Sequence, residues 1–267
     1  MISFNEIKSF FADSLRRNPY HFEYMLKEYF HYRILEIIFS SEYASMLSLI
    51  GGTNLRILHH IQRFSEDLDF DCFQLSREEF LQLTDKVITR LREEGIKVEA
   101  EDKEKDFKIT AFRRSVIFPG LLFEWGLTGH RGKKLLIKIE CEPHHSIYKP
   151  VKPIIQKFNV FTQIFTPHPG ILLSMKTGAV LERGKGRDYY DFIFLSGITD
   201  PDFGYLNMKF GITHHAQLYE RILESCEATD FEKKSRDFEK LVFDPNETRK
   251  ILLFKEYIRQ KYDQSTR

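Results

Sequence analysis

The stretch Ile50–Asp71, "IGGTNLRILHHIQRFSEDLDFD", constrains the fold of this chain more than any other. A glycine pair follows a short apolar run, and three acidic residues then occupy alternate positions, Asp67, Asp69 and Asp71. Successive side chains of a strand point to opposite faces, so the three carboxylates are expected on one face and the intervening Leu and Phe on the other. The stretch therefore predicts strand, turn, helix and strand, with like charges crowded together.

The glycine corner suggests a binding function. A strand that ends at Gly51 and Gly52 and opens into a helix, here predicted over Thr53–His60, directs backbone N–H groups and the positive helix end at one point, as phosphate sites do. Crowded carboxylates repel each other unless a cation lies between them, and hard oxygen ligands suit Mg²⁺. Taken separately, the glycines also fit a tight turn and the acids fit an exposed strand.

The remaining pattern predicts an α+β protein. Apolar residues at helical spacing indicate a long core-facing helix over Phe22–Ile38 and another that ends at Gly95. Strands are expected in "IKVEAE", "FKITAFRRSVIF" and "KLLIKIECE", and "PHHSIYKPVKPIIQKF" is expected to be an irregular crossing. From Pro169 onward the pattern is helical. We therefore expect a small mixed sheet flanked by helices in residues 1–165 and a helical domain in residues 166–267.

Composition gives no sign of a general polyanion or membrane partner. The chain has 267 residues, with 40 Lys plus Arg against 39 Asp plus Glu, so any site for nucleic acid must be local. No apolar run approaches the length of a membrane span and the N-terminus lacks a leader pattern, so a cytoplasmic protein is expected. The three cysteines have no ligand spacing and are interpreted as buried hydrophobic residues.

Two further segments carry charged residues at regular spacing. In "LLIKIECE", Lys138, Glu140 and Glu142 share one strand face. In "SMKTGAVLERGKGRDYYD", Lys176 and Arg183 lie two helical turns apart on one face. The same segment holds Asp188 and Asp191 on one face of the next helix, where Asp188 could equally be a helix cap.

Together these segments resemble a known family. The hydrophobic-Gly-Gly corner, with 14 residues between Gly52 and Asp67, resembles the polymerase-beta-type nucleotidyltransferase superfamily. "GGTNLR" followed by "RFSEDLDF" resembles the AbiEii/AbiGii toxin family of type IV toxin–antitoxin and abortive-infection systems. "LKEYFHYRILEIIF", "LLIKIECE" and the segment Leu172–Leu195 are similar to further blocks of that family, in the same order. The chain departs from the family at Asn54, where many members have Ala, and at Glu140, where Asp is common.

The resemblance implies an active site. It implies metal ligands at Asp67, Asp69 and Glu140, with Lys176, Asp188 and Asp191 as additional catalytic residues. The residues that it implies for nucleotide binding are Gly51, Gly52, Thr53, Arg56, Ser65, Lys176 and Arg183.

The implied activity is Mg²⁺- or Mn²⁺-dependent transfer of a nucleotide from an NTP to an acceptor. The family suggests RNA, such as the 3′ end of tRNA, and a cognate antitoxin as partner. Local support is limited to basic residues that could follow a phosphate backbone or form solvated surface: Arg113, Arg114, Lys133, Lys134, Lys149, Lys152 and Lys157. A protein acceptor, or a catalytically idle protein that binds nucleotide, RNA or antitoxin, remains an alternative.

Overall fold

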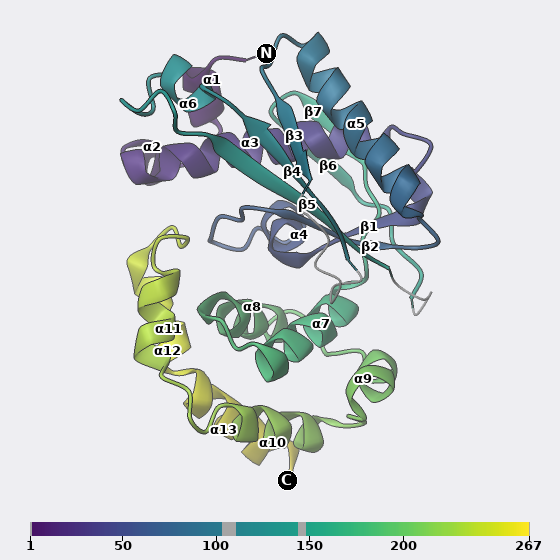
Figure 1. The fold of residues 1–267 in the computed structure, drawn as a ribbon. Helices are drawn as coiled ribbons and strands as arrows, with labels where there is room; N and C mark the ends of the chain where they lie inside the picture. Colours follow the sequence, from purple (N-terminus) through teal and green to yellow (C-terminus); the bar gives the residue numbers. More distant parts are fainter. Residues whose placement is uncertain (1, 103–110, 144–147, 267) are drawn as a thin grey trace. The chain divides into compact units, whose positions relative to one another are not determined.

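The structure, a computed structural model, describes residues 2–102, 111–143 and 148–266 (Figure 1). The chain forms two compact units. The first comprises Met1–His60 and Phe64–Thr166, and the second comprises Ile61–Arg63 and Pro167–Arg267. The three-residue segment Ile61–Arg63 thus belongs to the second unit although the flanking sequence belongs to the first.

The first unit combines helices with two sheets. Its helices are α1 (Phe4–Ser9), α2 (Asp13–Arg16), α3 (Phe22–Phe39), α4 (Gly51–Leu58), α5 (Arg77–Glu93) and α6 (Leu121–Glu124), with 3₁₀ turns η1 (Pro19–His21) and η2 (Ala44–Met46). Its strands are β1 (Leu47–Ile50), β2 (Leu68–Cys72), β3 (Glu99–Asp102), β4 (Phe112–Phe118), β5 (Leu135–Pro143), β6 (Ile154–Lys157) and β7 (Val160–Gln163).

The main sheet has five strands in the order β1-β2-β5-β4-β3 (Figure 1). Only the β2–β5 pair is parallel; the other three pairs are antiparallel. The predicted alternation is confirmed along β5, where Ile137 and Ile139 are buried. In β2, Leu68 and Phe70 are buried and Asp69 is half-buried, but Asp71 is buried as well. The expected mixed sheet flanked by helices is therefore present.

Helices α3 and α5 pack against each other, with α3 on β5 and α5 on β3 and β4. The apolar stripe of α3 faces the core as predicted, but the helix is buried on its other side as well, where β7 and α1 pack. Polar residues that a one-sided helix would expose to water, Lys27, Glu28 and His31, are consequently buried. Each of them has a polar partner in the structure.

The structure corrects several predicted boundaries. Helix α4 begins at Gly51 and ends at Leu58, two residues earlier at both ends than expected. The predicted irregular crossing contains β6, which pairs with β7 as a separate two-stranded sheet. The prolines of this segment concealed the strand because β6 begins only after Pro153. Part of the expected strand "FKITAFRRSVIF" lies outside the described residues, and β4 begins at Phe112.

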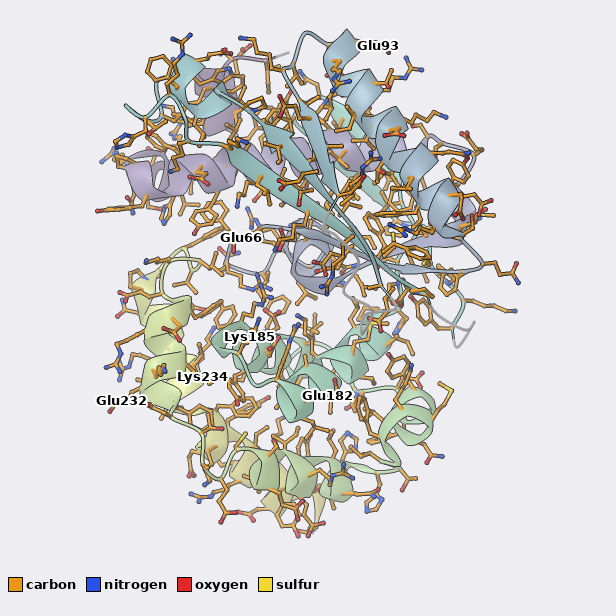
Figure 2. All side chains as sticks on the ribbon, viewed as in Figure 1. Glu66, Glu93, Glu182, Lys185, Glu232 and Lys234 are labelled. Carbon is orange, nitrogen blue, oxygen red and sulfur yellow. The ribbon has the colours of Figure 1, made fainter. Side chains whose placement is uncertain are left out.

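The second unit is helical in the part of it that the structure describes. Its helices are α7 (Pro169–Glu182), α8 (Gly186–Ser196), α9 (Phe203–Phe210), α10 (His215–Ser225), α11 (Phe231–Phe238), α12 (Arg249–Leu252) and α13 (Phe254–Ser265), with the 3₁₀ turn η3 (Pro245–Thr248). Helix α7 packs on α8, and α10 packs on α13. Glu182 and Lys185 flank the tight turn between α7 and α8 (Figure 2). Among the described residues, no helix is long and apolar enough to cross a membrane.

Candidate active site

The glycine corner joins β1 to α4. Gly51 has a φ of +73°, a region that favours glycine. A Cβ atom added to Gly51 would overlap Oδ2 of Asp69 and would lie 3.0 Å from Cβ of Asp69. The N-cap residue of α4, Ile50, makes no side-chain hydrogen bond to the helix. The first backbone N–H groups of the helix, which have no intrahelical acceptors, therefore begin beside the Asp69 carboxylate.

Two side chains of the first turn of α4 hold this corner in place. The Thr53 hydroxyl donates a hydrogen bond to the backbone carbonyl of Asp67, and Asn54 Nδ2 donates to the carbonyl of Leu49 at 2.7 Å and to Thr166 Oγ1. Thr53 and Asn54 are both fully buried. These bonds tie the helix start to β1 and to the residue that precedes β2. The Thr53 hydroxyl is thus already bonded within the fold. Of the polar groups of Thr53, this leaves the backbone N–H as the candidate donor to a phosphate.

The predicted acidic residues lie side by side on adjacent strands. In the strand register Asp69 is opposite Ile50 on one side and opposite Glu140 on the other, and Glu140 is in turn opposite Arg113. Directly paired residues share one face of a sheet. Asp69, Glu140 and Arg113 therefore form a row across β2, β5 and β4 on the face opposite the buried Leu68.

Basic side chains of the same unit contact two of the three predicted metal ligands. Asp67, which follows Glu66 (labelled in Figure 2), accepts a hydrogen bond from the Lys138 backbone N–H at 3.3 Å and lies 3.5 Å from Lys138 Nζ. Glu140 Oε2 lies 3.2 Å from Arg113 Nε. All four side chains are partly exposed. In the described part of the chain, no group of three or more His, Cys, Asp or Glu side chains is arranged to hold a metal ion.

The donor set nevertheless suits a hard divalent cation. Carboxylate oxygens are the preferred ligands of Mg²⁺, and the register brings Asp69 and Glu140 together on one face. The missing Cβ of Gly51 leaves room at Asp69 Oδ2. The carboxylates of Asp67 and Glu140 would have to exchange a basic partner for the ion.

Asp71 differs from the other two aspartates of β2. It is 2% exposed and accepts a hydrogen bond from the hydroxyl of Tyr148. The alternating pattern predicted its face correctly but gave no sign that Tyr148 would cover it.

Arg56 and Ser65, both predicted to bind nucleotide, lie in different surroundings. Arg56 Nε donates to Glu28 Oε2 at 2.8 Å, and Lys157 Nζ lies 2.7 Å from the other oxygen of Glu28. Burial alone would raise the pKa of Glu28, but Arg56 and Lys157 bring it below its usual value. Arg56 thus neutralises a buried carboxylate, while Ser65 is half-buried in the loop before β2.

The remaining predicted residues lie in the second unit and form two ion pairs, one between α7 and α8 and one between the C-cap of α7 and the first turn of α8. Lys176 Nζ is 2.6 Å from Oδ2 of Asp191, which is fully buried and also accepts two hydrogen bonds of 2.7 Å from Arg63. Burial would raise the pKa of Asp191, yet Arg63 and Lys176 bring it below its usual value.

Arg183 donates two hydrogen bonds, of 2.9 and 2.8 Å, to the buried carboxylate of Asp188. Asp188 also accepts from the backbone N–H of Lys185 at 3.1 Å, so it stabilises the start of α8. Tyr189 and Tyr190 are packing residues, each 2% exposed.

Several of the basic residues considered for RNA contact have acidic partners. Arg114 contacts Asp85 and Asp102, and Lys133 lies 2.7 Å from Glu23. Other members of that set, Lys134, Lys149 and Lys152, are exposed. The cysteines are free and buried, as expected.

Sequence reasoning missed two residues around the acidic groups. It did not connect Arg63 with Asp191, and no sequence signal could have done so, because 128 positions separate them. It considered Arg113 only as a possible RNA contact, since the β4–β5 register that places it opposite Glu140 is a tertiary property. Lys138 had a signal, because it shares a strand face with Glu140.

Comparisons with known proteins identify the family of the chain. The family described as "Nucleotidyl transferase AbiEii toxin, Type IV TA system" matches residues 33–263. No curated protein matches the chain.

Among solved structures, MenT4, a nucleotidyltransferase toxin from Mycobacterium tuberculosis H37Rv, has a similar fold with a TM-score of 0.70 at 14% identity, covering 100% of this chain and 90% of that one. JHP933 from Helicobacter pylori aligns with a TM-score of 0.49 at 18% identity, covering 91% of this chain and 94% of that one. Because the family match spans most of the chain, the protein belongs to the AbiEii nucleotidyltransferase toxin family of type IV toxin–antitoxin systems.

Proposed function

We propose that the protein transfers a nucleotide from an NTP to the 3′ end of an RNA, such as tRNA, with Mg²⁺ as the cofactor. The observation that carries the proposal is that the start of α4 lies beside Asp69, which is paired with Glu140 on the neighbouring strand. Backbone N–H groups that can donate hydrogen bonds to phosphate oxygens lie beside carboxylates that can hold a cation. A binding module would gain nothing from such crowded like charges.

In this proposal each part of the site has a separate task. Asp67, Asp69 and Glu140 would hold Mg²⁺, which when bound neutralises triphosphate charge and favours in-line displacement. Gly51, Gly52 and Thr53 would bind phosphate oxygens through their backbone N–H groups. The acceptor hydroxyl oxygen attacks the α phosphorus and releases its proton to solvent, while the bond to the β phosphate breaks to release pyrophosphate.

Incubation with each labelled NTP, Mg²⁺ and purified tRNA tests the proposal. Label should enter intact tRNA, but not tRNA whose 3′-terminal ribose has been oxidised with periodate, and Asp69→Asn should abolish the signal. Label in oxidised tRNA would exclude the 3′ end as acceptor. Label in protein from a cell extract, with none in RNA, would show a protein acceptor.

Expression in a bacterial host tests whether toxicity depends on this chemistry. Growth arrest is expected for the native chain and its loss for Asp67→Ala. Equal arrest by both chains, at matched protein levels, would mean that the protein stops growth by sequestering a cellular component and not by nucleotide transfer.

A further inference from the structure

The carboxylates proposed to hold metal are already neutralised in part by the protein. Lys138 contacts both oxygens of Asp67, through its backbone N–H at 3.3 Å to Oδ1 and through Nζ at 3.5 Å to Oδ2. Arg113 contacts Glu140 Oε2 at 3.2 Å. Asp67 and Glu140 thus each have a cation at ion-pair distance.

Strand pairing fixes the positions of both cations. Lys138 and Glu140 are alternate residues of β5 and share its polar face, while Arg113 is the direct register partner of Glu140 on β4. Lys138 and Arg113 therefore cannot leave this face without a change in the sheet. Their side chains are 37% and 40% exposed, so their charged ends can still move to a new acceptor.

We propose that Lys138 and Arg113 are internal counter-cations that keep a divalent ion from binding tightly until a triphosphate is present. The inference rests on the proposed function. Three carboxylates alone would attract a divalent ion strongly, whereas two nearby cations remove most of that attraction and repel the ion. A triphosphate provides new oxygen acceptors for both side chains, which frees Asp67 and Glu140 for the metal. Metal and triphosphate then bind together.

Binding measurements without catalysis test this proposal. Mn²⁺ alone is titrated by calorimetry, and inorganic triphosphate is then titrated at saturating Mn²⁺. Lys138→Met should tighten Mn²⁺ binding about fivefold, the upper range for one partly exposed charge pair, and should weaken triphosphate binding by a similar factor. Arg113→Met should change both affinities in the same directions.

Two matched variants distinguish this effect from general loss of charge. Lys138→Arg keeps a cation at the site and should behave as the native chain does. Lys97 forms an ion pair with Glu124 at 2.6 Å in the same unit, and Lys97→Met should leave both affinities unchanged. Equal melting temperatures would show that all variants are folded.

The outcomes separate the two proposals. If Lys138→Met and Arg113→Met bind Mn²⁺ as the native chain does, while Asp69→Asn loses the ion, the counter-cation proposal is wrong and the proposed function stands. If Asp69→Asn binds Mn²⁺ normally even with triphosphate, both proposals are wrong.

Discussion

The backbone of Gly51 lies directly against the carboxylate of Asp69. The β1–β2 register places Ile50 opposite Asp69, and the positive φ of Gly51 then turns the chain into α4 across that side chain. Any side chain at this position would occupy the space of Asp69 Oδ2. The start of the helix can therefore lie against the acidic strand only because residue 51 has no Cβ atom.

Gly51→Ala is predicted to damage both stability and transfer. An Ala at positive φ costs about 1–2 kcal/mol, and displacement of a catalytic carboxylate by an ångström can lower the rate about a hundredfold. Gly95→Ala is the control, because Gly95 has a φ of +82° but open space around its missing Cβ. We expect urea unfolding to show a lower free energy of unfolding in both variants. Labelled-NTP assays should show a lower transfer rate only in Gly51→Ala. Equal activities would contradict this role of Gly51.

Asp69→Asn is predicted to abolish transfer without loss of stability. The change keeps the size of the side chain and removes one of two neighbouring negative charges, so the melting temperature should stay equal or rise. Transfer should fall by about two to three orders of magnitude, as for loss of one preorganised electrostatic group. A large drop in melting temperature with unchanged nucleotide binding would assign Asp69 a structural role.

If Lys176 has the catalytic role that the family resemblance implies, Lys176→Ala should lower turnover by roughly two to three orders of magnitude, with a smaller effect on nucleotide binding. The second unit should remain folded, because Arg63 keeps its two hydrogen bonds to Asp191. Lys176→Arg should rescue only in part, since a planar guanidinium differs from a compact ammonium. Lys209→Ala, an exposed lysine of α9, is the control. Near-normal turnover in Lys176→Ala would make the Lys176–Asp191 pair purely structural.

His31 is predicted to make stability depend on pH. Burial lowers the pKa of His31 to about 4, from 6.5 in the unfolded chain. Between these values the unfolded state binds the proton and the folded state does not, so the free energy of unfolding falls as the pH decreases. From pH 7 to pH 5 this single group should account for about 2 kcal/mol.

His31→Gln tests this dependence, because Gln can still donate to the Glu66 carbonyl but does not titrate. Between pH 7 and pH 5, the free energy of unfolding measured with urea should change less for the variant than for the native chain. An unchanged difference would mean that His31 is not the titrating group.

The sequence by itself determined the local framework of the candidate site. Period-two alternation placed Asp69 and Glu140 on the polar faces of their strands, and the glycine pair marked the start of a helix. These properties depend on neighbouring residues in the chain, so a pattern of a few residues carries them. The resemblance of four ordered blocks gave the family, and the helical pattern after Pro169 gave the second unit its helices.

Only the tertiary structure decided which charges meet. The β4–β5 register places Arg113 opposite Glu140, packing on both sides of α3 buries Glu28 beside Arg56, and Arg63 joins a unit far from it in sequence to bind Asp191. Each contact depends on strand order, helix packing or chain crossing, which a local pattern does not contain. The physical reason is that a buried or crowded charge takes whichever opposite charge the fold brings within reach.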